Sequence, residues 1–400
     1  MVLSDRSRWH LLANAPAVGW LLALLAITLT HRYVPMSTWL LVHLLLLGAI
    51  TNAIFVWSAH FSDALLRRRV TIQSRRWQGL RLFGLNVGII SVITGVVSTH
   101  WIITLLGSIA VGVAVLSHAI TLTLHMRSAL ASRFGATVRY YVCAALALPI
   151  GAGLGATLAR NPAEPWHGRL VIAHAAVNVL GWIGLTVMGT LVTLWPTMLR
   201  TQIAPGAERV ARQVLPLLVV SIALTMTGAL VGFQPLAALG SAGYLGGILL
   251  ALRPLFHEAR KKTPAAYPTW SVLSALIWLV GSLADVVIVL TISPTWSVVI
   301  DRLGFLLIPL VAGFAAQVLF GALSFLVPVV LGGGPTTARG TQLRLERGSA
   351  GRIVLINVGL VICILPVPSL VRVLVSMLVL AGFAAFLPLL ASALIYARHV

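Results

Sequence analysis

Residues 170–194 read LVIAHAAVNVLGWIGLTVMGTLVTL, an apolar run in which His174 is the only ionisable side chain. A helix of about 20 mostly apolar residues is long enough to cross a bilayer. Runs of this kind recur along the whole chain, at approximately 11–30, 39–58, 80–98, 101–123, 137–158, 170–194, 213–232, 236–252, 270–292, 303–330, 350–366 and 373–396. The sequence therefore predicts an all-α polytopic membrane protein with about twelve transmembrane helices.

The composition agrees with this prediction. Of the 400 residues, 59% are hydrophobic and only 9% are charged, and the mean hydropathy is +1.00. A soluble, disordered or collagen-like chain does not have this composition. No loop between the runs is long enough for a separate soluble domain. We therefore expect one transmembrane domain over residues 1–400.

The net charge of +20 is explained by where the basic residues lie. With twelve spans both termini are on one side, and 23 of the 28 Lys and Arg residues fall on that side. Cytoplasmic loops of membrane proteins carry such an excess, so both termini are expected in the cytoplasm and the protein in the inner (plasma) membrane. The basic residues orient the chain and face the lipid bilayer, and nucleic acid is not an expected partner.

Three segments of the chain resemble one another. They read Gly48-AITNAIFVWSAHFSDAL, Gly181-WIGLTVMGTLVTLWPTML and Gly313-FAAQVLFGALSFLVPVV, and their first glycines are 133 and 132 residues apart. These segments are spans 2, 6 and 10, and a basic loop follows each of them. A repeat at a fixed period indicates repeated structural units. We expect three four-helix units arranged as a ring, at about 11–125, 137–252 and 270–397.

Familiar catalytic motifs are absent from the sequence. It contains no P-loop, no HExxH, no CxxCH and no nucleophile elbow, and its two cysteines, Cys143 and Cys363, are far apart. These absences argue against nucleotide binding, zinc proteolysis and covalently attached haem. Any chemistry must then depend on ionisable residues inside the spans.

Histidines inside a membrane are costly and usually functional. His43 in span 2 and His174 in span 6 are both expected about one turn below the outer surface. Two such imidazoles could hold haem iron or copper, with Gly48, Gly181 and Gly184 making room for a haem ring. His43 precedes its motif glycine by five residues and His174 by seven, so this offset predicts that they face different sides of their helices.

Other polar residues in the spans have weaker signals. His118 and His125 are seven residues apart and share a face of span 4, so they are further candidate ligands. Asp285, the only carboxylate deep in a span, could carry protons or hold the second nitrogen of a ligating histidine. His10 is expected at the surface. Each histidine could instead be a buried group bonded to a neighbouring helix, the role we expect for Asn52, Asn178 and Gln317.

The residues His43-LLLL-Gly48 and Ala173-His174-AAVNVL-Gly181-Trp182, together with the twelve-helix plan, resemble the haem-copper oxidase subunit I superfamily and its NnrS-like membrane proteins. The stretch Val42-His43-LLLLGAITNAIFVWS is similar to the membrane part of actinobacterial multicopper-oxidase-like fusions. The resemblance implies that His43 is a ligand of low-spin haem b. It also implies that His174 lies on the helix that supplies a copper ligand.

The sequence departs from that family where oxygen is reduced. Oxidases carry histidines in helices 7 and 10, whereas here span 7 has none and span 10 has Gln317 but no histidine. The usual binuclear centre is therefore not expected. An oxidoreductase component remains a hypothesis, because an enzymatic activity is not determined by these residues.

Three functions remain open. The first is a membrane haem protein, with or without copper, for electron transfer or nitric-oxide or copper-related redox chemistry. Its site would lie in the outer half between helices 2 and 6, and its partners would be quinol and an external copper protein. The second is a transporter for copper or a small solute, because repeats and polar residues near the midplane are typical of transporters. The third is a non-catalytic subunit that anchors a partner.

Overall fold

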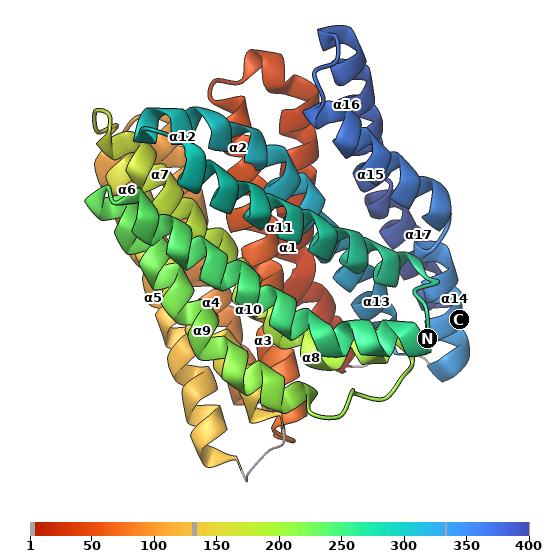
Figure 1. Ribbon diagram of the computed structural model, residues 1–400. Coiled ribbons are helices and arrows are strands. Elements are labelled where there is room, and N and C mark those ends of the chain that lie inside the picture. Colours follow the sequence, from red (N-terminus) through yellow and green to blue (C-terminus); the bar gives the residue numbers. More distant parts are fainter. Residues whose placement is uncertain (1–4, 130–133, 333, 400) are drawn as a thin grey trace.

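The computed structural model describes residues 5–129, 134–332 and 334–399. This part of the chain is helical, without β-strands, and contains twelve helices long and apolar enough to cross a membrane. Figure 1 shows them side by side, with α2, α7 and α12 at one end of the bundle and both termini away from that end. The prediction of an all-α polytopic membrane protein with twelve spans is confirmed.

Each unit contains several helical segments. The first unit comprises α1 (Asp5–Thr30), η1 (His31–Tyr33), α2 (Ser37–His43), η2 (Leu44–Ile50), α3 (Thr51–Leu65), α4 (Ile72–Val97) and α5 (Trp101–Ser128). The second comprises α6 (Gly135–Leu158), α7 (Trp166–Ala175), η3 (Ala176–Gly184), α8 (Leu185–Leu199), α9 (Ala207–Val231) and α10 (Gln234–Lys261). The third comprises α11 (Tyr267–Ile292), α12 (Trp296–Leu303), η4 (Gly304–Leu306), η5 (Pro309–Ala316), α13 (Gln317–Leu331), α14 (Gly334–Leu345), α15 (Ser349–Ile364), α16 (Ser369–Ala384) and α17 (Phe386–His399).

The three motif helices form the core of the bundle. In the apolar windows of spans 2, 6 and 10, 67%, 72% and 72% of the residues are buried, against 17–50% for the other nine described spans. Each motif helix packs against the first helix of its own unit: η2 on α1, η3 on α6 and η5 on α11. The same pairing of helices therefore occurs three times, and the division into four-helix units stays a prediction.

A local distortion repeats with the motif. Each motif helix contains one π-helical segment, and these are η2, η3 and η5. Each segment contains its motif glycine, which is Gly48 in η2, Gly181 in η3 and Gly313 in η5. π-Helical turns inside α-helices are rare and often occur at functional sites. Because three independent distortions at one register are unlikely to arise by chance, they support the repeat.

Units 1 and 3 also share a polar cluster. In unit 1 Trp20 donates its indole N–H to Asn86 Oδ1 over 2.8 Å, and Asn52 and Asn86 exchange amide hydrogen bonds of 2.8 and 3.1 Å. In unit 3 the same pattern links Trp278, Asn357 and Gln317. These bonds confirm the expectation that Asn52 and Gln317 bond to neighbouring helices.

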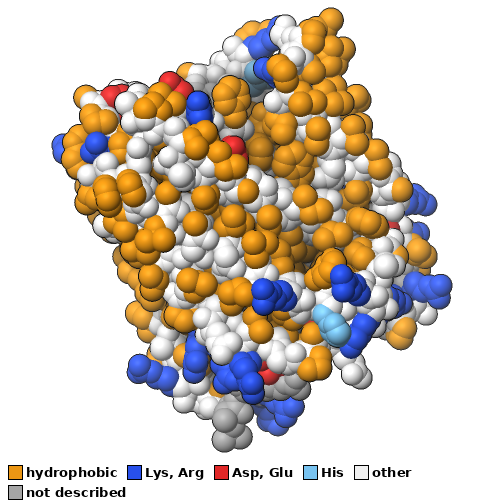
Figure 2. Space-filling view, viewed as in Figure 1, with side chains coloured by type: hydrophobic (Ala, Val, Ile, Leu, Met, Phe, Trp, Pro, Cys, Tyr) orange, Lys and Arg blue, Asp and Glu red, His pale blue; other side chains and the backbone are white. Residues whose placement is uncertain are grey.

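Charged groups gather at the ends of the bundle. Figure 2 shows Lys and Arg mainly along the end that lies opposite α2, α7 and α12, with a wide band of apolar side chains between the two ends. An apolar band flanked by polar ends is what a bilayer requires of a spanning bundle. The cytoplasmic placement of the basic end stays a prediction.

The loop after span 10 differs from expectation. The sequence suggests a flexible exit near Gly334 and an eleventh span that begins near residue 350, but helix α14 (Gly334–Leu345) already lies there and packs against α17. Arg344 lies over the ring of Tyr396, 3.7 Å from its centroid. Packing against α17 therefore orders a segment that has little apolar periodicity of its own.

Candidate functional site

The ends of spans 2 and 6 formed by α2 and α7 bring two histidines together. His43 is the last residue of α2, directly before the π-helical η2, and His174 lies in the last turn of α7, just before η3. Their ring centroids are 6.2 Å apart and the rings are tilted by 30°. The two residues proposed from the sequence as a pair therefore form one site, although they come from different units.

The register of the two helices explains this meeting. His43 and His174 are 131 residues apart, and so are Thr51 and Trp182, whose side chains are joined by a 3.0 Å hydrogen bond further along the same helices. The two contacts fix spans 2 and 6 at one relative height. The Thr51–Trp182 bond lies eight residues from each histidine, about 12 Å toward the centre.

The offset of two residues does not keep the two histidines apart. Spans 2 and 6 bring different sides of the repeated motif toward each other, because His43 and His174 meet although they are not at equivalent positions of the motif. Two residues correspond to a turn of about 200° around a helix. That turn directs His174 back toward span 2 and brings its ring to His43.

Backbone carbonyls hold one nitrogen of each ring. His43 Nδ1 lies 2.8 Å from the carbonyl oxygen of Trp39, and His174 Nδ1 lies 2.9 Å from that of Gly151 in α6. Both distances fit a hydrogen bond donated by Nδ1–H, which leaves Nε2 as the nitrogen with a free electron pair. Among the described residues, no hydrogen bond engages Nε2 of either ring. This is the pattern in which a metal-ligating histidine is usually held.

Two further contacts fix the ring planes. The indole of Trp39 stacks on His43 with centroids 4.0 Å apart. The amide Nδ2 of Asn178 donates a 2.8 Å hydrogen bond to the His174 carbonyl. It also lies 3.2 Å from His174 Nδ1, and this is a packing contact because Nδ1–H is donated to Gly151. Asn178 therefore bonds within its own helix, and the expectation that it bonds to a neighbouring helix was wrong.

The glycines that were expected to make room for haem do not do so. A side-chain carbon at Gly48 would lie 2.8 Å from Trp20, at Gly181 2.8 Å from Ala147, and at Gly184 2.5 Å from the hydroxyl of Tyr244. These glycines allow helices to pack closely. Both histidine side chains are nevertheless partly exposed, so another group can reach them.

His118 and His125 lie elsewhere. His118 is buried, stacks on Phe55 at 4.3 Å and hydrogen-bonds through Nε2 to Ser58 over 2.9 Å. Ser58 is 15 residues along span 2 from His43, or about 22 Å. His118 is therefore not part of the His43–His174 site.

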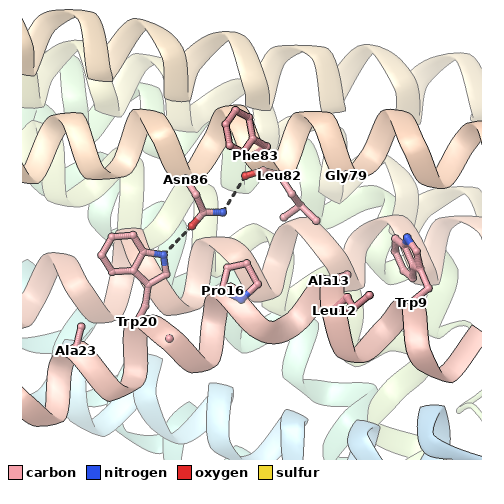
Figure 3. Close-up of a pocket in the computed structure, with 11 residues that line it drawn as sticks. Trp9, Leu12, Ala13, Pro16, Trp20, Ala23, Gly79, Leu82, Phe83 and Asn86 are labelled. Atoms are coloured by element: carbon pink, nitrogen blue, oxygen red, sulfur yellow. Dashed lines mark hydrogen bonds between the residues drawn. The ribbon is translucent and has the colours of Figure 1, made fainter. Parts of the chain in front are cut away.

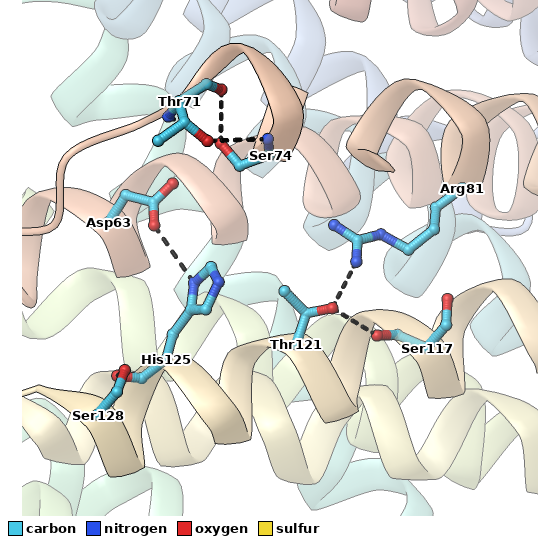
Figure 4. Close-up of polar contacts among 8 residues, drawn as sticks. All are labelled: Asp63, Thr71, Ser74, Arg81, Ser117, Thr121, His125 and Ser128. Atoms are coloured by element: carbon cyan, nitrogen blue, oxygen red, sulfur yellow. Dashed lines mark hydrogen bonds and ion pairs between the residues drawn. The ribbon is translucent and has the colours of Figure 1, made fainter. Parts of the chain in front are cut away.

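His125 forms a polar contact nearer the opposite end. Its Nδ1 lies 3.3 Å from Asp63 Oδ1, and Figure 4 shows this pair beside the contact between Arg81 and Thr121. His125 and Asp63 are each 20% exposed. The geometry therefore gives His125 a carboxylate partner.

Asp285 does not hold either histidine. It is exposed on α11, and backbone carbonyls occupy the nitrogens that it was expected to hold. The expectation that Asp285 supports a ligating histidine is therefore corrected, whereas a role in proton transfer stays a prediction. An exposed carboxylate on a spanning helix is costly in lipid.

Sequence reasoning missed several residues. Trp39 and Gly151 hold the rings, and only Trp39 could have been found, because it lies one turn before His43. His10 is buried at 4% exposure, with its ring 4.8 Å from that of His60, and the expectation of a surface position was wrong. His10 is close to the N-terminus in sequence, which gives no sign of the packing around it.

The two imidazoles fit a metal centre with two protein ligands. Imidazole–metal bonds are about 2 Å long, so two imidazoles on opposite sides of one metal have ring centroids roughly 6 Å apart. The separation in this protein is 6.2 Å. Among the described residues there is no group of three or more His, Cys, Asp and Glu side chains that could hold a metal. With two imidazoles as its donors, the site would suit haem iron or copper(I), and His43 and His174 would be the residues that hold the metal.

Comparisons with protein-family models and with curated proteins find no match for this chain.

Proposed function

We propose that this protein is a membrane metalloprotein for electron transfer or for redox chemistry related to nitric oxide or copper, in which His43 and His174 ligate one metal centre. The centre is a b-type haem or a copper ion, and it lies in the outer half of the membrane between spans 2 and 6. The observation that carries the proposal is the 6.2 Å separation of two rings whose Nδ1 atoms are both held by backbone carbonyls.

The arrangement supports electron transfer better than bond-making catalysis. If His43 and His174 both held a haem iron, the metal would supply one-electron oxidation and reduction, and the two side chains would occupy the positions that a substrate needs. Fixed rings suit this task because the ligands do not have to move when the charge of the metal changes. Quinol as the donor and an external copper protein as the acceptor complete the proposal.

The direct test is an absorption spectrum of the protein purified in detergent, recorded oxidised and then reduced with dithionite, with pyridine haemochrome and metal analysis on the same sample. We expect about one haem or one copper per chain, and its loss in His43→Ala and in His174→Ala. His125→Ala is the matched control and should keep the metal. A folded protein without haem or copper, prepared with both supplied, would refute the proposal.

A second candidate function, a subunit that anchors a partner, is favoured by one observation. Asp285 is exposed seven residues before the end of α11, at a depth of about 10 Å. A basic group from another chain would offset the cost of a carboxylate there. If so, a subunit that co-purifies with the protein should be lost in Asp285→Leu and kept in the neighbouring variant Gly281→Leu.

A further inference from the structure

A long apolar groove runs between α1 and α4 in unit 1, and neither His43 nor His174 lines it. Its volume is about 610 Å³. Figure 3 shows Trp9, Pro16 and Trp20 of α1 facing Leu82, Phe83 and Asn86 of α4 across it. Its floor includes small residues, and it spans α1 from Trp9 to Ala23, or about 21 Å. One leaflet of the hydrocarbon core is about 15 Å thick, so the groove is long enough for a complete acyl chain.

One end of the groove is basic. The guanidinium of Arg75 lies 5.7 Å from the ring centroid of Trp9 and donates a 3.5 Å hydrogen bond to the backbone carbonyl of Asp5. In the described part of the chain, Arg75 forms no ion pair. Arg76 and Arg8 are exposed close by in the sequence. Phosphate groups bind to arginine through paired, charge-assisted hydrogen bonds.

The polar group in the middle of the groove is already satisfied. Asn86 Oδ1 accepts hydrogen bonds from Trp20 and Asn52, and Asn86 Nδ2 donates to Asn52 and to the Leu82 carbonyl. A quinone headgroup would need a donor to its carbonyl oxygens, and no free donor remains at Asn86. The chemistry of the groove therefore favours an acyl chain along its length, with the polar end of the ligand beside Arg75.

We propose that this groove is a binding site for one anionic phospholipid, with an acyl chain against Trp20 and Phe83 and the phosphate on Arg75. Apolar contact alone gives no preference, because the bilayer is as apolar as the groove. Selectivity must come from the charged end, where each basic residue attracts anionic lipid. The groove contributes by placing the phosphate beside Arg75 and by slowing the exchange of the bound lipid with lipids of the bilayer.

The glycines of the groove allow it to be filled without disturbing the helices. A side-chain carbon at Gly19 or Gly79 has no neighbouring atom within 4 Å, and both residues line the groove. Leucine at either position would occupy the space of the lipid's acyl chain. Gly84, also on α4, is equally open and does not line the groove, so Gly84→Leu is the matched control.

The test is native mass spectrometry of the full-length protein in detergent, titrated with phosphatidylglycerol or with phosphatidylcholine of the same chains. We expect one retained phosphatidylglycerol, and its loss in Gly19→Leu and in Gly79→Leu but not in Gly84→Leu. Arg75→Gln should lower the preference for the anionic lipid about fivefold, whereas Arg260→Gln should not. Equal retention in the filled and control variants would overturn the proposal, and so would displacement of the lipid by a soluble quinone.

This test is separate from that of the metal centre. The groove variants leave His43 and His174 unchanged, so metal content measured on the same samples reports whether they are folded. Loss of lipid with full metal content, or with an unchanged thermal unfolding midpoint in a protein without metal, supports the lipid site by itself. If Gly84→Leu also lost the bound lipid, the metal and the thermal unfolding transition, leucine on α4 would unfold the protein. Lipid retention in Gly19→Leu, on α1, would then test the lipid site.

Discussion

Two histidine sites that contact span 2 differ in which ring nitrogen the protein uses. At the end formed by α2 and α7, His43 and His174 are partly exposed, and both Nδ1 atoms are held by backbone carbonyls. Nearer the opposite end, His118 is 1% exposed and its Nε2 is bonded to Ser58, while its Nδ1 has no hydrogen-bond partner among the described residues. The deeper histidine is therefore the poorer ligand candidate.

The difference teaches that burial alone does not indicate a ligand. His118 fills space against Phe55 and ties α5 to α3 through Ser58, which is the work of a structural residue. His43 and His174 are more exposed than His118, and no hydrogen bond from the described residues engages their Nε2 atoms. A polar side chain inside a membrane lowers stability. An imidazole that is held in one position, with a ring nitrogen that bonds to no other part of the protein, is therefore the stronger sign of function.

The largest expected effect is on stability, at the inner site. His118→Ala removes a buried ring that packs on Phe55 and leaves the Ser58 hydroxyl without a partner. We expect a loss of about 2 kcal/mol in the free energy of unfolding, with the same metal content per folded protein. Unfolding in a denaturant series, followed by metal analysis of the folded fraction, measures both. Metal loss in folded His118→Ala protein would remove the distinction between the two sites.

The spans were the most predictable part of the molecule. Each of the twelve apolar runs overlaps one of the helices that can cross a membrane, because the bilayer demands long apolar helices whatever the tertiary packing. The eleventh was the least accurate. Its predicted start near 350 leaves out α14, whereas the span begins at Gly334.

The site was predictable only as two residues at one depth. Residue type and span direction placed His43 and His174 at similar heights, because depth follows from position along a helix. That the two rings face each other could not be derived, because it depends on how spans 2 and 6 are rotated relative to each other. The carbonyl of Gly151 could not be found either, since its contact with His174 depends on how α6 packs against α7.

A smaller effect is expected from a residue that positions His174. Asn178 contacts the His174 ring and backbone, and a side-chain carbon at Gly151 would strike its amide. Asn178→Leu should therefore let the ring turn and weaken metal binding by about tenfold. Retention of metal under increasing chelator, or of haem under transfer to apomyoglobin, measures this change.

Asn52→Leu is the matched control for that variant. It removes a buried amide from span 2 that bonds to Asn86 and does not touch either histidine. It should reduce stability by about 1 kcal/mol and leave metal affinity unchanged. Equal weakening of metal binding in both variants would show that the amide supports the bundle in general and not the ring of His174.

The smallest effect separates two glycines on one helix. A side-chain carbon at Gly155 would lie 2.9 Å from His174 Cε1, whereas one at Gly153 has no atom within 4 Å. Gly155→Ala must push the His174 ring by a few tenths of an ångström toward span 2, while Gly153→Ala leaves it in place. We expect a metal-affinity change of about threefold with a shifted absorption band in Gly155→Ala only.

Because both variants replace glycine by alanine in α6, their effects on helix propensity are equal. Any difference between them therefore reports the contact with His174. Identical spectra and affinities in the two variants would mean that the His174 ring can shift without consequence. A ring held by the Gly151 carbonyl at Nδ1 and by a metal at Nε2 could not shift in this way. The outer histidines would then be structural residues like His118, and the two sites would differ only in depth.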